Sequence, residues 1–177
     1  MKKLYVVGNK ASKSLSPTIF NYWFRKYNIK ASYGYLELTE KNFHNKIKDI
    51  LEKKDTLGLN VTIPFKNKII KHLGKIDAHA KKIGAVNCVT NKKTINGTNT
   101  DWTGYYKTLP NIKQTKNRKV IILGYGGASH AIHYVLKKRG FKDILIFNRS
   151  KKKIKYSKNT EYTKKYSDLE THLEGVF

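Results

Sequence analysis

Short apolar runs and stretches of helical spacing alternate along the first half of the chain. Runs rich in β-branched and aromatic residues predict strands over residues 3–7, 31–38 and 57–63. Between these strands, apolar residues recur at helical spacing, first at Ile19, Phe20, Trp23, Phe24 and Tyr27, and then at Phe43, Ile47, Ile50 and Leu51. Ser16, which precedes Pro17, and Thr39 are typical caps for the two helices. The alternation predicts an α/β fold with a largely parallel sheet.

After residue 63 the pattern changes to shorter elements. Pro64 ends the third strand because proline cannot donate to a ladder, and a further helix is expected over residues 66–73. Residues 86–90 and 94–98 predict a hairpin.

A polar, basic stretch without periodicity at residues 110–118 predicts a domain boundary between residues 101 and 118, with 101–109 as a connecting helix. Beyond it, a strand over 119–123, a helix over 128–138 and a strand over 143–147 form a βαβ unit, as in the mononucleotide-binding half of a doubly wound sheet. The lysine-rich residues 151–165 suggest a charged helix. The predicted domains are therefore residues 1–109 and 119–177.

A glycine-rich turn, Gly124-Tyr125-Gly126-Gly127-Ala128-Ser129, follows the strand at 119–123 and opens a helix, as the dinucleotide fingerprint requires. Glycines allow the backbone to approach a pyrophosphate at the helix N-terminus. Ser129 stands where the fingerprint usually has glycine or alanine, so a plain glycine turn is the alternative.

The end of the next strand discriminates between cofactors. NAD sites place Asp or Glu there, whereas NADP sites use an arginine, and this chain has Asn148-Arg149-Ser150. The planar guanidinium of Arg149 suits a 2′-phosphate, although a surface arginine is the alternative. The prediction is NADP, with seven candidate cofactor-binding residues: Gly124, Gly126, Gly127, Ala128, Asn148, Arg149 and Ser150.

Polar residues in the first domain follow predicted strand ends or flank a helix start. The hydroxyls of Ser14 and Ser16 lie beside Pro17, where they suit a carboxylate. Four more polar residues, Thr62, Lys66, Asn87 and Asp101, come at or just after strand ends, so a parallel sheet would gather them on one rim. Taken singly, such a polar residue is more often a loop residue whose hydrogen bonds are satisfied locally, and a lysine such as Lys66 is more often simply solvated. Together the six describe a site for a polyhydroxylated acid.

Four segments carry a resemblance to a known family. They are Lys13-Ser14-Leu15-Ser16-Pro17, Asn60-Val61-Thr62-Ile63-Pro64-Phe65-Lys66, Gly84-Ala85-Val86-Asn87 and Asn96-Gly97-Thr98-Asn99-Thr100-Asp101. In that order, and followed by the turn at Gly124, they closely resemble the shikimate dehydrogenase family over residues 4–150. The chain departs from the family where Phe20 precedes Asn21, a position that usually holds histidine, and where Cys88 replaces a common threonine.

The resemblance implies a fold and an activity. The fold would be an N-terminal α/β substrate-binding domain followed by a partial Rossmann NADP-binding domain. The six polar residues would bind shikimate, with Lys66 and Asp101 as the catalytic pair. The whole enzyme would reversibly reduce 3-dehydroshikimate to shikimate with NADPH in the chorismate branch of aromatic amino-acid biosynthesis. Two alternatives stay open: an NAD-linked quinate/shikimate dehydrogenase, which Arg149 disfavours, and a non-catalytic fragment that binds shikimate or a nucleotide.

The chain ends at Gly175-Val176-Phe177, which resembles the start of another strand, whereas a doubly wound sheet needs several more. We therefore expect a fragment of a longer gene product, or the product of an early-terminated gene. Alone, it should bind shikimate weakly and form no measurable NADPH, because the missing part would hold the nicotinamide.

The amino-acid composition limits the classes of binding partner that the protein is expected to have. The formal net charge of +25 would attract nucleic acid, but the lysines are scattered over nearly every predicted helix instead of forming one stripe with aromatic residues. Binding of anionic small molecules explains the positive net charge better than binding of nucleic acid does. The single cysteine excludes an intramolecular disulfide, no Cys/His cluster has metal-ligand spacing, and no apolar run reaches membrane-spanning length. A cytoplasmic enzyme is expected, and a homodimer is compatible with the sequence.

Overall fold

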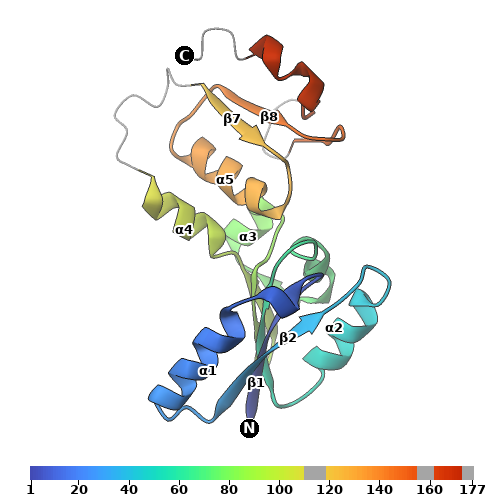
Figure 1. Ribbon diagram of the computed structural model, residues 1–177, viewed down its shortest axis with the longest axis vertical. Coiled ribbons are helices and arrows are strands. Elements are labelled where there is room, and N and C mark those ends of the chain that lie inside the picture. Colours follow the sequence, from blue (N-terminus) through green and yellow to red (C-terminus); the bar gives the residue numbers. More distant parts are fainter. Residues whose placement is uncertain (110–118, 155–161, 173–177) are drawn as a thin grey trace. The chain divides into compact units, whose positions relative to one another are not determined.

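The computed structural model describes residues 1–109, 119–154 and 162–172, and the chain divides into two compact units, Met1–Asn99 and Thr100–Phe177 (Figure 1). Strands and helices alternate within both, so the predicted α/β class is confirmed. The assignment of residues 1–109 to substrate and 119–177 to cofactor stays a prediction.

The first unit contains one mixed six-stranded sheet. Its strands are β1 (Lys2–Gly8), β2 (Ala31–Glu37), β3 (Thr56–Val61), β4 (Lys75–Ile76), β5 (Cys88–Asn91) and β6 (Ile95–Thr98), in the order β2-β1-β3-β5-β6-β4. Strand β1 pairs in parallel with both β2 and β3. Strand β5 runs antiparallel to β3 and β6, which confirms the predicted hairpin. The parallel strands β1 and β3 therefore end on the same rim.

Helices pack against the sheet and contribute to the apolar core of the first unit. They are α1 (Ser16–Lys26), α2 (Phe43–Leu51) and α3 (Ala78–Ile83), with 3₁₀ turns η1 (Ala11–Lys13) and η2 (Lys68–His72). Helix α2 buries Phe43, Ile47 and Leu51 against the sheet, as its spacing predicts. Each such side chain stabilises the fold by about 1.5–3 kcal/mol.

Helix α1 buries its apolar stripe only in part. Phe20 and Phe24 pack against Tyr33 and its neighbours, and the Phe20 and Tyr33 rings stack with centroids 4.6 Å apart. Trp23 and Tyr27 of the same stripe are exposed, by 46% and 64%. The helix begins at Ser16, so this serine is its first residue and not its cap.

The segment after β3 differs from the predicted strand and helix. Strand β3 ends at Val61, the Ile63–Pro64 peptide bond is cis, and a turn over residues 63–67 leads into η2. The end of β1 is close enough to this segment that a Cβ on Gly8 would lie 2.5 Å from the Thr62 methyl group. Glycine at position 8 therefore lets Thr62 lie directly against the end of β1.

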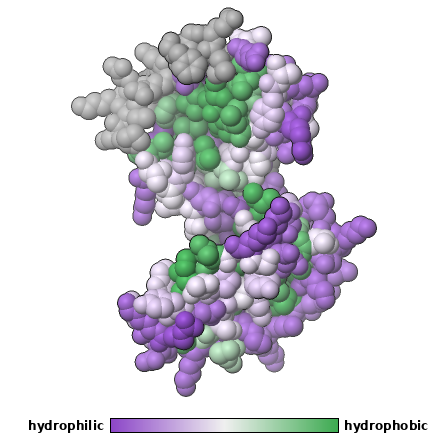
Figure 2. All heavy atoms as spheres, viewed as in Figure 1, coloured by the Kyte–Doolittle hydropathy of each residue, from purple (hydrophilic) through white to green (hydrophobic). Residues whose placement is uncertain are grey.

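The second unit holds the predicted βαβ arrangement. Its elements are α4 (Asp101–Thr108), β7 (Val120–Leu123), α5 (Gly127–Lys138), β8 (Ile144–Phe147) and the 3₁₀ turns η4 (Tyr166–Asp168) and η5 (Glu170–His172). Strands β7 and β8 are parallel. Ile122 of β7, Leu136 of α5 and Ile146 of β8 belong to one buried apolar cluster. Figure 2 shows apolar residues on the visible face of this unit and mainly polar residues on that of the first.

The charged helix predicted over residues 151–165 is not found at its described positions. Lys153 instead forms an isolated antiparallel bridge with Tyr162, and Lys164 bridges in parallel to Phe147. Residues 155–161 of that prediction, and the predicted final strand at 175–177, lie outside the described residues.

Candidate functional site

Two backbone hydrogen bonds hold the ends of neighbouring strands together in the first unit. The Val61 N–H donates to the Asn87 carbonyl over 2.8 Å, and the Val86 N–H donates to the Lys66 carbonyl, also over 2.8 Å. Because these bonds join the last residue of β3 and the turn after it to the segment before β5, Thr62 and Lys66 are held beside Asn87. Main-chain contacts therefore bring Thr62, Lys66 and Asn87 to one rim, although β5 runs antiparallel to β3 and not parallel as expected.

A pocket of about 510 Å³ opens at this rim. Five predicted substrate-binding residues line it: Ser14, Ser16, Thr62, Lys66 and Asn87. All five side chains are half-buried. Asp101, the sixth, is the first residue of α4 in the second unit.

The pocket is positively charged. Lys10 and Lys13 line it together with Lys66, and the described lining residues include no carboxylate. Hydroxyl and amide groups supply donors and acceptors beside these cations, and the Ser14 hydroxyl already accepts from the Ser16 N–H over 3.2 Å. This set suits a small anion that also carries hydroxyl groups.

Tyr33 and Asn60 are two contributors that the sequence pattern did not single out. The Tyr33 hydroxyl donates to the Asn60 Oδ1 over 2.6 Å, and Asn60 lines the pocket. A hydrogen bond from Ser16 also reaches the Tyr33 hydroxyl. Tyr33 is 3% exposed, so it connects helix α1 to strand β3 beneath the pocket. The signal available was Asn60 itself, a polar residue near the end of an apolar strand.

Burial of Tyr33 leads to a pH prediction. Desolvation, and next the charge of Cys88, raise the pKa of Tyr33 from 10.0 to about 12, against the lowering by Ser16. Between pH 10 and 12 the unfolded tyrosine loses its proton while the folded one keeps it, so stability falls as pH rises. Urea unfolding across this range should show a steeper decline for the wild type than for Tyr33→Phe. Parallel declines would contradict the prediction.

Asn99 positions another part of the rim. Its buried amide donates to the Ala85 carbonyl over 2.9 Å, which fixes the segment that ends at Asn87. Asn99 belongs to a segment that carried the family resemblance, and the structure shows it as a positioning residue in the first unit.

The predicted cofactor residues gather at the ends of β7 and β8. Gly124 has a φ of +92°, a conformation that favours glycine, and α5 begins at Gly127. The Tyr125 N–H donates to the Asn148 Oδ1 over 3.1 Å, and Asn148 Nδ2 donates to the Ser150 carbonyl over 2.7 Å. Asn148 therefore ties together the two loops that hold the predicted residues.

The remaining cofactor candidates lie on the surface, either in these loops or, for Ala128, in the first turn of α5. Gly126, Ala128, Arg149 and Ser150 are exposed. Arg149 is the second residue after the end of β8, the second strand of the βαβ unit, where dinucleotide-binding folds place the residue that contacts the ribose.

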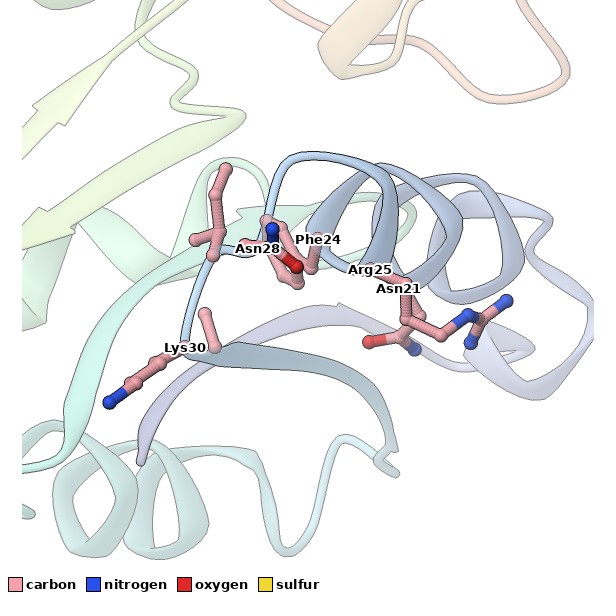
Figure 3. Close-up of a pocket in the computed structure, with 7 residues that line it drawn as sticks. Asn21, Phe24, Arg25, Asn28 and Lys30 are labelled. Atoms are coloured by element: carbon pink, nitrogen blue, oxygen red, sulfur yellow. The ribbon is translucent and has the colours of Figure 1, made fainter.

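A second pocket of about 620 Å³ lies where α1 ends and β2 begins (Figure 3). Asn21, at its wall, already exchanges two hydrogen bonds with the Tyr33 backbone, at 2.8 and 2.9 Å. None of the predicted site residues lines this larger pocket. The smaller pocket is the candidate site because five predicted polar side chains converge there.

Comparisons with known proteins show which family this chain is similar to. The family described as shikimate dehydrogenase substrate binding domain matches residues 6–89. The shikimate dehydrogenase (NADP(+)) of Thermotoga maritima is 36% identical over 148 residues, which cover 84% of this chain and 55% of that protein. The chain is therefore similar to shikimate dehydrogenases, and to their substrate-binding domain in particular. It spans about 55% of the length of that relative.

Solved structures of the shikimate dehydrogenase family have the same fold. Shikimate dehydrogenase 1 from Peptoclostridium difficile matches with a TM-score of 0.82 and 31% identity, over 96% of this chain and 63% of that one. The Thermus thermophilus enzyme, crystallised with NADP(H) and shikimate, matches with a TM-score of 0.70 and 26% identity, over 85% of this chain and 57% of that one.

The described residues were also searched for metal-binding clusters and membrane-spanning helices. Within residues 1–109, 119–154 and 162–172, no group of three or more His, Cys, Asp or Glu side chains is arranged to hold a metal ion. In the same ranges, no helix has the length and apolar character needed to cross a membrane.

Proposed function

We propose that this chain provides the shikimate-binding unit and an NADP-binding unit of an NADP-dependent shikimate dehydrogenase. The observation that carries the proposal is the convergence of five predicted polar residues on one cationic pocket in the first unit. Shikimate has one carboxylate and several hydroxyls, and the pocket offers lysines, hydroxyls and an amide. A cytoplasmic location belongs to the same proposal, and so does the formation of a homodimer.

The second unit fits a dinucleotide. A Cβ on Gly126 would meet no atom within 4 Å, so the turn leaves open space in front of the N-terminus of α5, a helix of 12 residues. The first-turn N–H groups of such a helix suit a pyrophosphate. Gly124, Gly126, Gly127 and Ala128 would face the phosphates, whereas Arg149 and Ser150 would hold the 2′-phosphate.

The residues of the first unit would divide the chemical work. Ser14 and Ser16 would donate to the substrate carboxylate, and Thr62 and Asn87 would hold ring hydroxyls. Lys66 would take the proton of the reacting hydroxyl during oxidation and return it during reduction, with Asp101 as its catalytic partner. NADP, when bound, supplies the hydride acceptor.

Two measurements test the proposal. Calorimetric titration of the 177-residue chain with shikimate tests the pocket. The reaction itself is measured as NADPH absorbance in a fusion of residues 1–109 to the nucleotide-binding part of the Thermotoga maritima enzyme, because the chain spans about 55% of that enzyme's length. Shikimate binding that is unaffected by Asn87→Ala together with Thr62→Val would remove the pocket from the proposal.

Arg149→Ala tests the choice of cofactor. We expect it to weaken NADP binding by about 1.5–3 kcal/mol, as for the loss of a hydrogen bond to a charged group, and to leave NAD binding nearly unchanged. Both affinities are measured by calorimetry. Lys137→Ala, an exposed cation in the last turn of α5, is the matched control. Equal losses for the two cofactors would show that Arg149 does not contact the 2′-phosphate.

A further inference from the structure

Two histidines face each other on the surface of the first unit, outside the pocket at the rim. His44 lies in α2 and His72 ends η2, and His44 Nδ1 lies 2.8 Å from His72 Nε2. The two rings are 27° from parallel with centroids 5.1 Å apart. His44 is exposed and His72 is half-buried, so solvent reaches the pair.

The buried core holds both rings in place. Phe43 makes edge contacts with His44 and His72, with ring centroids 5.2 and 5.9 Å apart. Phe43 in turn stacks on Phe65, which is fully buried, at 4.2 Å. The pair is therefore supported from below by packed aromatic rings and joins two separate elements.

We propose that His44 and His72 form a binding site for one divalent transition-metal ion, Zn²⁺ or Cu²⁺, with water in the remaining positions. Neutral imidazole is a preferred ligand for both metals. In the metal-free pair, one imidazole N–H lies between the two nitrogens. On metal binding, the ring that donates this hydrogen bond would carry its proton on its other nitrogen. Each ring would then have its N–H on the nitrogen that points away, and both facing nitrogens would be free to bind the ion.

The distance between the nitrogens suits this exchange. Two Zn–N bonds of about 2.0–2.1 Å in tetrahedral geometry place the nitrogens about 3.3 Å apart. The pair would have to open by about half an ångström from its hydrogen-bonded distance, which rotation of the exposed His44 side chain can supply. Burial, and next His44, lower the pKa of His72, which favours its metal-binding neutral form.

Two protein ligands imply weaker binding than a four-ligand structural site. Because the ligands come from α2 and η2, a bound ion would link these elements in the folded state only. Metal should therefore raise the melting temperature of the protein in a concentration-dependent way.

The test uses the 177-residue chain without an affinity tag, titrated calorimetrically with Zn²⁺ alone. We expect one ion per chain, and at least about tenfold weaker binding for His44→Gln and for His72→Gln, since even changes outside the ligand set cost 10–100-fold. His79→Gln, in the first turn of α3, is the control and should bind as the wild type does. His44 is exposed, so His44→Gln decides the matter if His72→Gln does not fold.

Electron paramagnetic resonance with Cu²⁺ distinguishes the pair from a single histidine. Hyperfine coupling to two imidazole nitrogens is expected in the wild type and to one in His44→Gln. A one-nitrogen spectrum in the wild type, unchanged Zn²⁺ affinity in His44→Gln, or no binding of either ion by the wild type would overturn the proposal.

Discussion

Replacing Lys66 with alanine is expected to lower kcat about 10²–10⁴-fold, the usual range for loss of a general acid or base. This corresponds to about 3–5 kcal/mol of transition-state stabilisation. The lysine lines the pocket and its carbonyl is fixed by the Val86 N–H, so its side chain starts from a held position. NADPH formation by the fusion of residues 1–109 gives kcat, and calorimetry gives shikimate affinity.

Two further variants separate proton transfer from charge. Lys66→Arg keeps a cation but cannot give up a proton near neutral pH, so we expect its kcat to stay low while shikimate affinity is largely kept. Lys68→Ala removes a nearby lysine whose ammonium pairs with Glu40 at 2.9 Å, and it should behave as the wild type. Near-normal turnover by Lys66→Ala would make Lys66 an ordinary solvated lysine.

Phe65→Ala is expected to destabilise the protein by about 3–5 kcal/mol, the usual cost of removing a buried phenylalanine side chain. Phe65 is 0% exposed, stacks on Phe43 and belongs to the main core of the first unit. The cavity left behind would also loosen the turn that holds Lys66. Urea unfolding of the wild type and the variant measures the loss.

Tyr35→Ala is the matched control for Phe65→Ala. Tyr35 lies in β2 and is 54% exposed, so its removal should change stability by no more than about 0.5 kcal/mol. Phe65→Leu should fall between the two because it fills most of the space. A loss below about 1 kcal/mol for Phe65→Ala would mean that the core closes around the gap.

Much of the fold could be read from spacing alone. The alternation of strands with helical stripes, the hairpin of β5 and β6 and the βαβ unit of β7, α5 and β8 all follow from local patterns of apolar residues. The rim residues Thr62 and Lys66 could be placed after the third strand, whereas Asn87 joins them because β5 runs antiparallel to β3, so the start of β5 lies beside the end of β3. Local periodicity determines which segments become elements.

Boundaries and exposure could not be read in the same way. The spacing of α1 predicts one apolar stripe, but whether Trp23 or Phe24 is covered depends on where β2 and η1 lie. Likewise, the turn that carries Lys66 replaces a predicted helix because Pro64 and the contacts of the buried Phe65 determine its path.

The sequence by itself determined the α/β class, the order of the elements and the polar residues that follow strand ends. Only the tertiary structure decided which distant residues meet: Tyr33 with Asn60, Asn99 with Ala85 and His44 with His72. The reason is physical, since periodicity is a property of neighbours along the chain. A hydrogen bond between residues 14 to 28 positions apart, as in these three pairs, depends instead on how whole elements pack.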